Sequence, residues 1–145
     1  PVGAVVTRED MQKPPVRMWL FGMVTILEMH FLRTIEERYP DGSWVEEISE
    51  GRLEKARSLL EERRQRGQHP SLLDCLQLAD KAHILLRDAE ARNDFGFESR
   101  KAGRREIKTL ESLRNNLAHA QDIVTHDWAA ITLIARRVDR IVSRL

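Results

Sequence analysis

Apolar residues recur along most of this chain at intervals of three and four positions, the spacing of helices that pack one side against a core. The pattern is clearest in the C-terminal segment, where isoleucine, valine and leucine follow one another at helical spacing. It predicts helices over about 16–39, 49–67, 71–92, 99–121 and 125–145. The fold class we expect is therefore all-α, an antiparallel bundle of four to five helices.

Helix-breaking and helix-capping residues separate these segments. Pro40-Asp41-Gly42 ends the first helix, and Ser43 and Trp44 open a turn before the second, which ends at Gly67. Residues 93–97 form a connector, and Ser99 is placed to cap the fourth helix. Short connections of this kind favour antiparallel neighbours.

The first helix holds the longest apolar run, from Met18 to Leu32, interrupted by Glu28 and His30. The run is shorter than the roughly 20 residues that cross a bilayer, so we expect a buried helix and no membrane contact. Its apolar residues surround most of its circumference, which predicts burial on two sides, in the bundle and against a partner chain. Glu28 and His30 are expected to find their polar partners at that dimer contact.

Ahead of the first helix, the β-branched run 2–7 reads as one short strand, which needs partners outside this sequence. Residues 3–11 follow the pattern Gly-x-x-x-Thr-x-x-Asp and resemble the closing strand and helix start of a CBS domain. The resemblance implies that Thr7 and Asp10 contact an adenine nucleotide, and only in a longer parent protein that supplies the other strands. It divides the chain into a CBS-like remnant of a truncated preceding domain, 1–14, and a helical domain, 15–145. An N-cap at Asp10 after a fortuitous strand is the alternative.

Length, net charge and cysteine content limit the number of domains, the kind of nucleic-acid surface and the cellular compartment. At 145 residues the chain suits one domain, and a formal net charge of +1 means that any nucleic-acid surface must be a local patch. The single cysteine, Cys75, excludes an internal disulfide and, with no signal sequence evident, fits a cytoplasmic protein.

The chemistry concentrates in the segment 113–119, Leu-Arg-Asn-Asn-Leu-Ala-His. Arg114 can hold a phosphate, and His119 is the side-chain type that exchanges a proton near neutral pH. On a helix His119 lies about 140° from Arg114, while Asn115 is one turn below His119 on the same side. Either the helix distorts before His119, or arginine and histidine meet across a groove that another element completes. The plainer interpretation of Arg114 is an ion pair at the core edge, with Glu111 or Glu28.

This segment resembles the R-x4-6-H signature of the HEPN family, small helical bundles that are often ribonucleases. The resemblance implies a homodimer in which both motifs line one cleft, with Arg114, Asn115 and His119 as catalytic residues. It implies RNA cleavage through the 2′-hydroxyl without a metal or other cofactor, in a toxin or stress-response protein that an antitoxin or other partner controls. The alternative is a non-catalytic HEPN-like module for dimerisation or partner binding in a CBS-containing regulatory protein.

Two groups of cations accompany the motif and are candidates for binding the RNA backbone. They are Arg104, Arg105 and Lys108 on the fourth helix, and Arg136 and Arg140 on the fifth. Solvated helix faces explain them almost as well. A metal site at His119, Asp122 and His126 is disfavoured, because its spacing crosses a predicted helix break.

Overall fold

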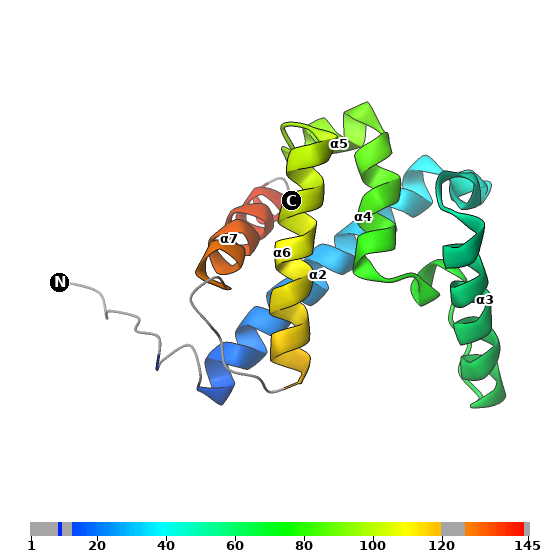
Figure 1. Cartoon of the computed structure of the whole chain (residues 1–145), viewed down its shortest axis with the longest axis horizontal. Coiled ribbons are helices and arrows are strands. Elements are labelled where there is room, and N and C mark those ends of the chain that lie inside the picture. Colours follow the sequence, from blue (N-terminus) through cyan, green and yellow to red (C-terminus); the bar gives the residue numbers. More distant parts are fainter. Residues whose placement is uncertain (1–8, 10–12, 120–126, 144–145) are drawn as a thin grey trace. The chain divides into compact units, whose positions relative to one another are not determined.

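The computed structural model describes residue 9 and residues 13–119 and 127–143 (Figure 1). In these residues the chain forms six α-helices and two short 3-10 helices, with no strand, which confirms the all-α class. The elements are α2 (Pro14–Arg38), η1 (Ser43–Glu47), α3 (Glu50–Gln65), η2 (Leu73–Cys75), α4 (Leu78–Arg87), α5 (Ala89–Phe95), α6 (Arg100–Ala118) and α7 (Asp127–Val142). The predicted strand at 2–7, with Thr7 and Asp10, lies outside the described residues.

The chain divides into two compact units. The terminal unit combines the segments Pro1–Leu27 and Lys108–Leu145, and the central unit is the segment Glu28–Ile107. Helices α2 and α6 each contribute one part to each unit.

The terminal unit is built from the first half of α2, the second half of α6 and α7. Leu20 is fully buried at its centre, and four partly buried side chains pack against it: Val16, Leu117, Trp128 and Ile131. Leu110 and Leu113 of α6 and Ala130 and Ile134 of α7 are also buried. The apolar positions that predicted these helices therefore form the core of this unit.

One side of α2 in the terminal unit remains exposed although it is apolar. Met18 is 75% exposed, Trp19 57%, Ile26 46% and Phe21 41%, and we call these four residues the α2 apolar surface. By length and composition α2 is able to cross a membrane, and 33% of its apolar window is buried in protein. A core helix of a soluble protein passes the same test, so the fold is compatible with a soluble protein.

The central unit packs the second half of α2 against α4 and α5. Phe31 is fully buried and meets Phe95 edge to face, with ring centroids 4.9 Å apart. Arg38, the last residue of α2, donates hydrogen bonds to both carboxylate oxygens of Asp88, at 2.6 and 2.7 Å, and one to Glu90 at 2.9 Å. This forked contact fixes the end of α2 to the start of α5.

Glu28 and His30 find partners within the same chain, so the expected pairing at a dimer contact is not needed to explain them. Lys81 of α4, 4% exposed, donates to Glu28 at 3.0 Å. The His30 ring contacts Phe95 with centroids 5.3 Å apart. A buried lysine requires such a carboxylate, since an unpaired charge in a core is strongly destabilising.

The predicted single helix over 71–92 is wrong, because the chain forms η2, α4 and α5 there. Gln77 begins α4 with a capping box in which Asp80 accepts from the Gln77 N–H at 3.2 Å. Asp88 leaves the helical conformation, with φ −89° and ψ 121°, and accepts from the Ala91 N–H at 3.0 Å. Both side chains satisfy backbone donors that a continuous helix would bond internally, so each starts a new helix.

Candidate functional site

The arginine-histidine motif occupies the last two turns of α6, in the terminal unit. The helix ends at Ala118, and the His119 N–H still donates to the Asn115 carbonyl at 3.0 Å. Helical geometry thus reaches His119 without distortion. This removes one of the two ways in which Arg114 and His119 were expected to meet.

Two contacts hold the motif segment in place. Leu113 is fully buried, and Leu117 packs on Leu20 of α2. Arg17 of α2 donates from Nη2 to the Asn116 carbonyl at 2.9 Å. That carbonyl belongs to the last turn of α6, where carbonyls lack a partner in the helix and the helix dipole favours a cation. Arg17 is therefore a C-terminal cap of the motif helix.

Sequence reasoning missed Arg17 as a contributor to this site. It lies 99 residues from Asn116 along the chain. A basic residue in the first turns of a helix carries no local signal of this role. Only the packing of α2 on α6 brings the two together.

Asn115 and His119 are exposed on one side of α6, one turn apart. Lys108 is exposed on the same side, roughly 16 Å from His119 along the helix axis at 1.5 Å per residue. An amide, an imidazole and an ammonium group thus follow one line on the surface of the terminal unit. Such a line presents a proton-transfer group next to donors for phosphate oxygens.

Arg114 does not share this line. It is half-buried and lies about 140° around α6 from His119, on the side of the buried residues Leu110 and Leu113. Within one terminal unit the helix therefore points the guanidinium and the imidazole in different directions. A site that uses both needs a further element or a second copy of the chain.

The remaining basic candidates are surface residues. Arg104 and Arg105 are exposed on the part of α6 that belongs to the central unit. Arg136 and Arg140 are exposed one turn apart on α7 of the terminal unit, with exposed Asp139 beside them. All four reach the surface, and Asp139 weakens the positive potential beside Arg136 and Arg140.

Among the residues that the structure describes, no group of three His, Cys, Asp or Glu side chains is placed to hold a metal ion. Asp122 and His126, which were weighed with His119 as ligands, lie outside those residues.

The chain was compared with protein-family models, with curated proteins and with solved structures. No family model, no curated protein and no solved structure matches it.

Proposed function

We propose that this protein is a metal-independent endoribonuclease of the HEPN type that works as a homodimer with a composite active site. The observation that carries the proposal is the placement of the motif. His119 is exposed at the end of α6 beside Asn115. Arg114 lies about 140° away around the helix, and in the proposed homodimer a second copy supplies the group that one copy cannot bring to the same phosphate.

The chemistry follows from two histidines facing one phosphodiester. One neutral His119 takes the proton of the ribose 2′-hydroxyl, whose oxygen attacks the adjacent phosphorus. The second, protonated His119 gives its proton to the departing 5′-oxygen. Arg114 stabilises the charge on the phosphoryl oxygens, and Asn115 donates a hydrogen bond to the substrate. The products are a 2′,3′-cyclic phosphate and a 5′-hydroxyl.

The nucleophile belongs to the RNA and is already next to the phosphorus, so proximity supplies much of the rate without a metal-activated water. DNA lacks this hydroxyl and is expected to resist cleavage. Lys108, Arg104, Arg105, Arg136 and Arg140 are proposed to neutralise backbone phosphates, which makes RNA binding weaken as salt concentration rises.

The biological setting is part of the same proposal. Residues 3–11 resemble the end of a CBS domain, which suggests a longer cytoplasmic protein in which an adenine nucleotide controls the helical domain. A toxin or stress-response role, with an antitoxin or other regulatory partner, fits an enzyme that destroys RNA.

The first test incubates the purified chain with total RNA and with a matched DNA in EDTA. We expect cleavage of RNA only, and loss of at least about 100-fold in rate for His119→Ala and for Arg114→Ala, the range typical of a removed proton-transfer group and of a removed charge-stabilising donor. His69→Ala and Arg64→Ala, exposed residues of the central unit, are matched controls that retain activity. Circular dichroism checks that every variant is folded.

Product ends decide the mechanism. Cyclic phosphate and 5′-hydroxyl termini support attack by the 2′-oxygen, whereas 5′-phosphate termini exclude it. Cleavage that survives in both motif variants would refute the assignment of the site.

A second candidate function is favoured by the α2 apolar surface. Four large apolar side chains exposed on one helix are typical of a protein–protein contact. A non-catalytic module that dimerises a CBS-containing regulatory protein or docks a partner would use this surface and leave the motif as a structural feature. A stable dimer that leaves RNA intact would favour this function.

A further inference from the structure

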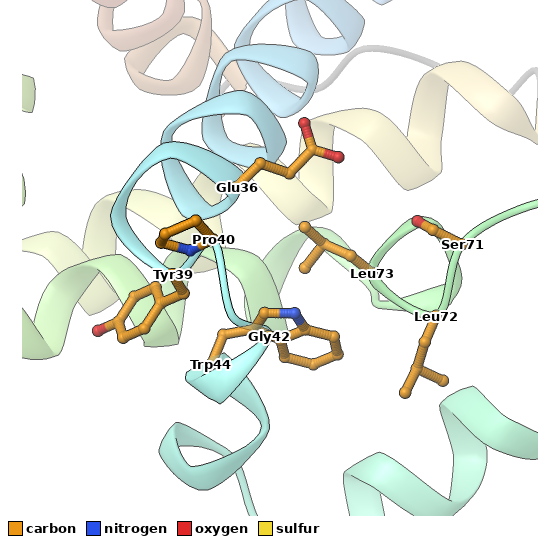
Figure 2. A pocket seen from close by; sticks show the side chains of 8 residues that line it. All are labelled: Glu36, Tyr39, Pro40, Gly42, Trp44, Ser71, Leu72 and Leu73. Carbon is orange, nitrogen blue, oxygen red and sulfur yellow. The ribbon is translucent and has the colours of Figure 1, made fainter.

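The central unit contains a cavity of about 270 Å³ that the proposed ribonuclease site does not use. Three segments surround it: the end of α2, the turn into η1, and the turn into η2 (Figure 2). The lining residues are Glu36, Tyr39, Pro40, Gly42, Trp44, Ser71, Leu72 and Leu73. Pockets for drug-sized ligands measure roughly 300–1,000 Å³, so this cavity suits a smaller molecule.

Both turns are fixed by their own hydrogen bonds. Gly42 adopts a left-handed conformation with φ 79°, which reverses the chain after Pro40 and brings Trp44 back toward α2. In the second turn the Ser71 N–H donates to Asp74 at 2.8 Å, and the Asp74 N–H donates to Ser71 Oγ at 3.1 Å. The cavity therefore has walls that are set before a ligand arrives.

Trp44 supplies an unused donor in this cavity. Its side chain is buried, with only 7% of the residue exposed. Over the described residues no hydrogen-bond acceptor is found for its indole N–H. Figure 2 shows the indole nitrogen on the ring edge that faces Leu73 and Glu36. No described side-chain nitrogen or oxygen is both buried and without a partner, so the indole nitrogen reaches solvent at the cavity, where an acceptor atom of a ligand would take the place of water.

Glu36 supplies a hydrogen-bond acceptor at the rim of the cavity. Its carboxylate is exposed and makes no hydrogen bond or ion pair with another described residue. Asp41 and Asp74 lie next to lining residues, and hydrogen bonds from the Ser43 hydroxyl and N–H hold the pKa of Asp41 below its usual range. No lining residue is basic. The rim is therefore negative and accepts hydrogen bonds.

We propose that this cavity binds an amino-substituted nitrogen heterocycle of the size of one nucleobase. A ring nitrogen or carbonyl of the ligand accepts from the Trp44 N–H, and its exocyclic amino group donates to the Glu36 carboxylate. Carboxylates pair with the amino group of cytosine in this way. Pro40, Leu72 and Leu73 supply apolar contacts for the faces of the ring.

The charge of the rim selects among sources of such a ring. A phosphate would approach Glu36, Asp41 and Asp74, and each of these carboxylates repels it. The ligand is therefore a free base or nucleoside, rather than a nucleotide or a base within RNA. The cavity is distinct from the motif, which belongs to the terminal unit.

Proton–nitrogen correlation spectra test this proposal, because the chain has three tryptophans and hence three indole N–H signals. The Trp44 signal is identified by its loss in Trp44→Phe. Cytidine is expected to shift this signal with a Kd of about 1 mM, and to leave the signals of Trp19 and Trp128 in place. Uridine, which presents a carbonyl where cytidine has its amino group, and cytidine monophosphate are each expected to bind at least about tenfold more weakly.

Variants separate the roles of the two polar groups. Glu36→Gln is expected to weaken cytidine binding at least about tenfold, while Glu37→Gln, an exposed neighbour that does not line the cavity, leaves it unchanged. Trp44→Phe keeps an aromatic ring and is expected to lose binding, followed through ligand line broadening.

Three results would overturn the proposal: no shift of the Trp44 signal at 10 mM cytidine, equal binding of uridine, or unchanged affinity in Glu36→Gln. A preference for cytidine monophosphate would overturn the choice of an uncharged ligand. All of these readouts are independent of RNA cleavage, so failure here leaves the proposed ribonuclease untouched.

Discussion

His83 on α4 shows how the environment of one residue controls its protonation. Burial lowers its pKa below 6.5, and the positive charges of Arg104, Arg52 and Arg87 lower it further, while Asp80 acts in the opposite direction. The folded protein therefore prefers the neutral imidazole. Unfolding removes these effects and restores an ordinary histidine.

Stability should consequently fall as the solution becomes acidic. Because the pKa of His83 is lower in the folded state, the unfolded chain binds more protons as pH drops through about 6.5. Above that pH His83 is neutral in both states and has no effect on stability, whereas below it protonation of the unfolded chain lowers the free energy of unfolding. We expect His83→Gln to lose less of its urea midpoint than the parent between pH 7.5 and 5.5. His69→Gln, an exposed histidine, should behave like the parent, and equal losses in all three proteins would contradict this explanation.

For single residues, the sequence does not predict burial when the partner that makes burial possible lies far away along the chain. His83 follows Leu76 and Ala79 at helical spacing, which predicts a place on an apolar stripe, and the structure finds it half-buried. The sequence pattern gave no reason to expect Asp80 and Lys81 to be buried. The partner of Asp80 is Arg52, 28 residues away, and the partner of Lys81 is Glu28, 53 residues away. Charged residues look like surface residues until the partner that compensates their burial is known.

At the scale of the elements, the sequence predicts a helix end correctly where a single capping residue determines it. Ser99 was expected to cap the fourth helix, and its hydroxyl accepts from the Ala102 N–H at 3.0 Å. The prediction of one helix over 71–92 missed the break between α4 and α5, because no proline or glycine lies between Leu86 and Arg92 to signal a helix end. Asp88 is also held by Arg38 from a distant helix, and that contact is absent from any local pattern.

Two glycines in helices give a matched test of element packing. A methyl group at Gly103 of α6 would collide with the buried Leu86 side chain, whereas one at Gly51 of α3 meets nothing within 4 Å. Replacing a helical glycine by alanine normally stabilises, since it restricts the unfolded chain. We expect Gly51→Ala to raise the free energy of unfolding by about 0.5 kcal/mol. Gly103→Ala is expected to lower it by about 1 kcal/mol, the net of overpacking and propensity. Urea denaturation measures both, and a Gly103→Ala protein as stable as Gly51→Ala would refute the close contact.

For the molecule as a whole, the sequence predicted two buried sides for the first helix. One side is buried within the chain, and the other side, the α2 apolar surface, is exposed, so its burial against a partner stays a prediction. The candidate site was predicted to a similar extent. The helical spacing predicts Asn115 beside His119 and Arg114 on another side of α6, and the homodimer that the resemblance implies stays a prediction.

We expect the α2 apolar surface to hold the proposed homodimer together. Trp19→Glu places a charge in the middle of that contact and should convert a dimer into a monomer at about 10 μM, because an unpaired charge in an interface is costly. Ser58→Glu, on exposed α3, is the control that keeps the parent's mass. Light scattering measures the mass, and a Trp19→Glu protein of unchanged mass would place the dimer contact elsewhere.

The hydrogen bond from Arg17 to the Asn116 carbonyl joins the start of α2 to the end of the helix that carries His119. Any ligand or domain that displaces Arg17 must also disturb the last turn of α6. Thermodynamic linkage then makes the effect mutual. If the ligand changes the affinity for RNA at the proposed site by some factor, RNA bound there changes the affinity for the ligand by the same factor. Arg17 would thus couple the proposed RNA site to a second binding event, and equal fold-changes in the two binding constants are the measurable sign.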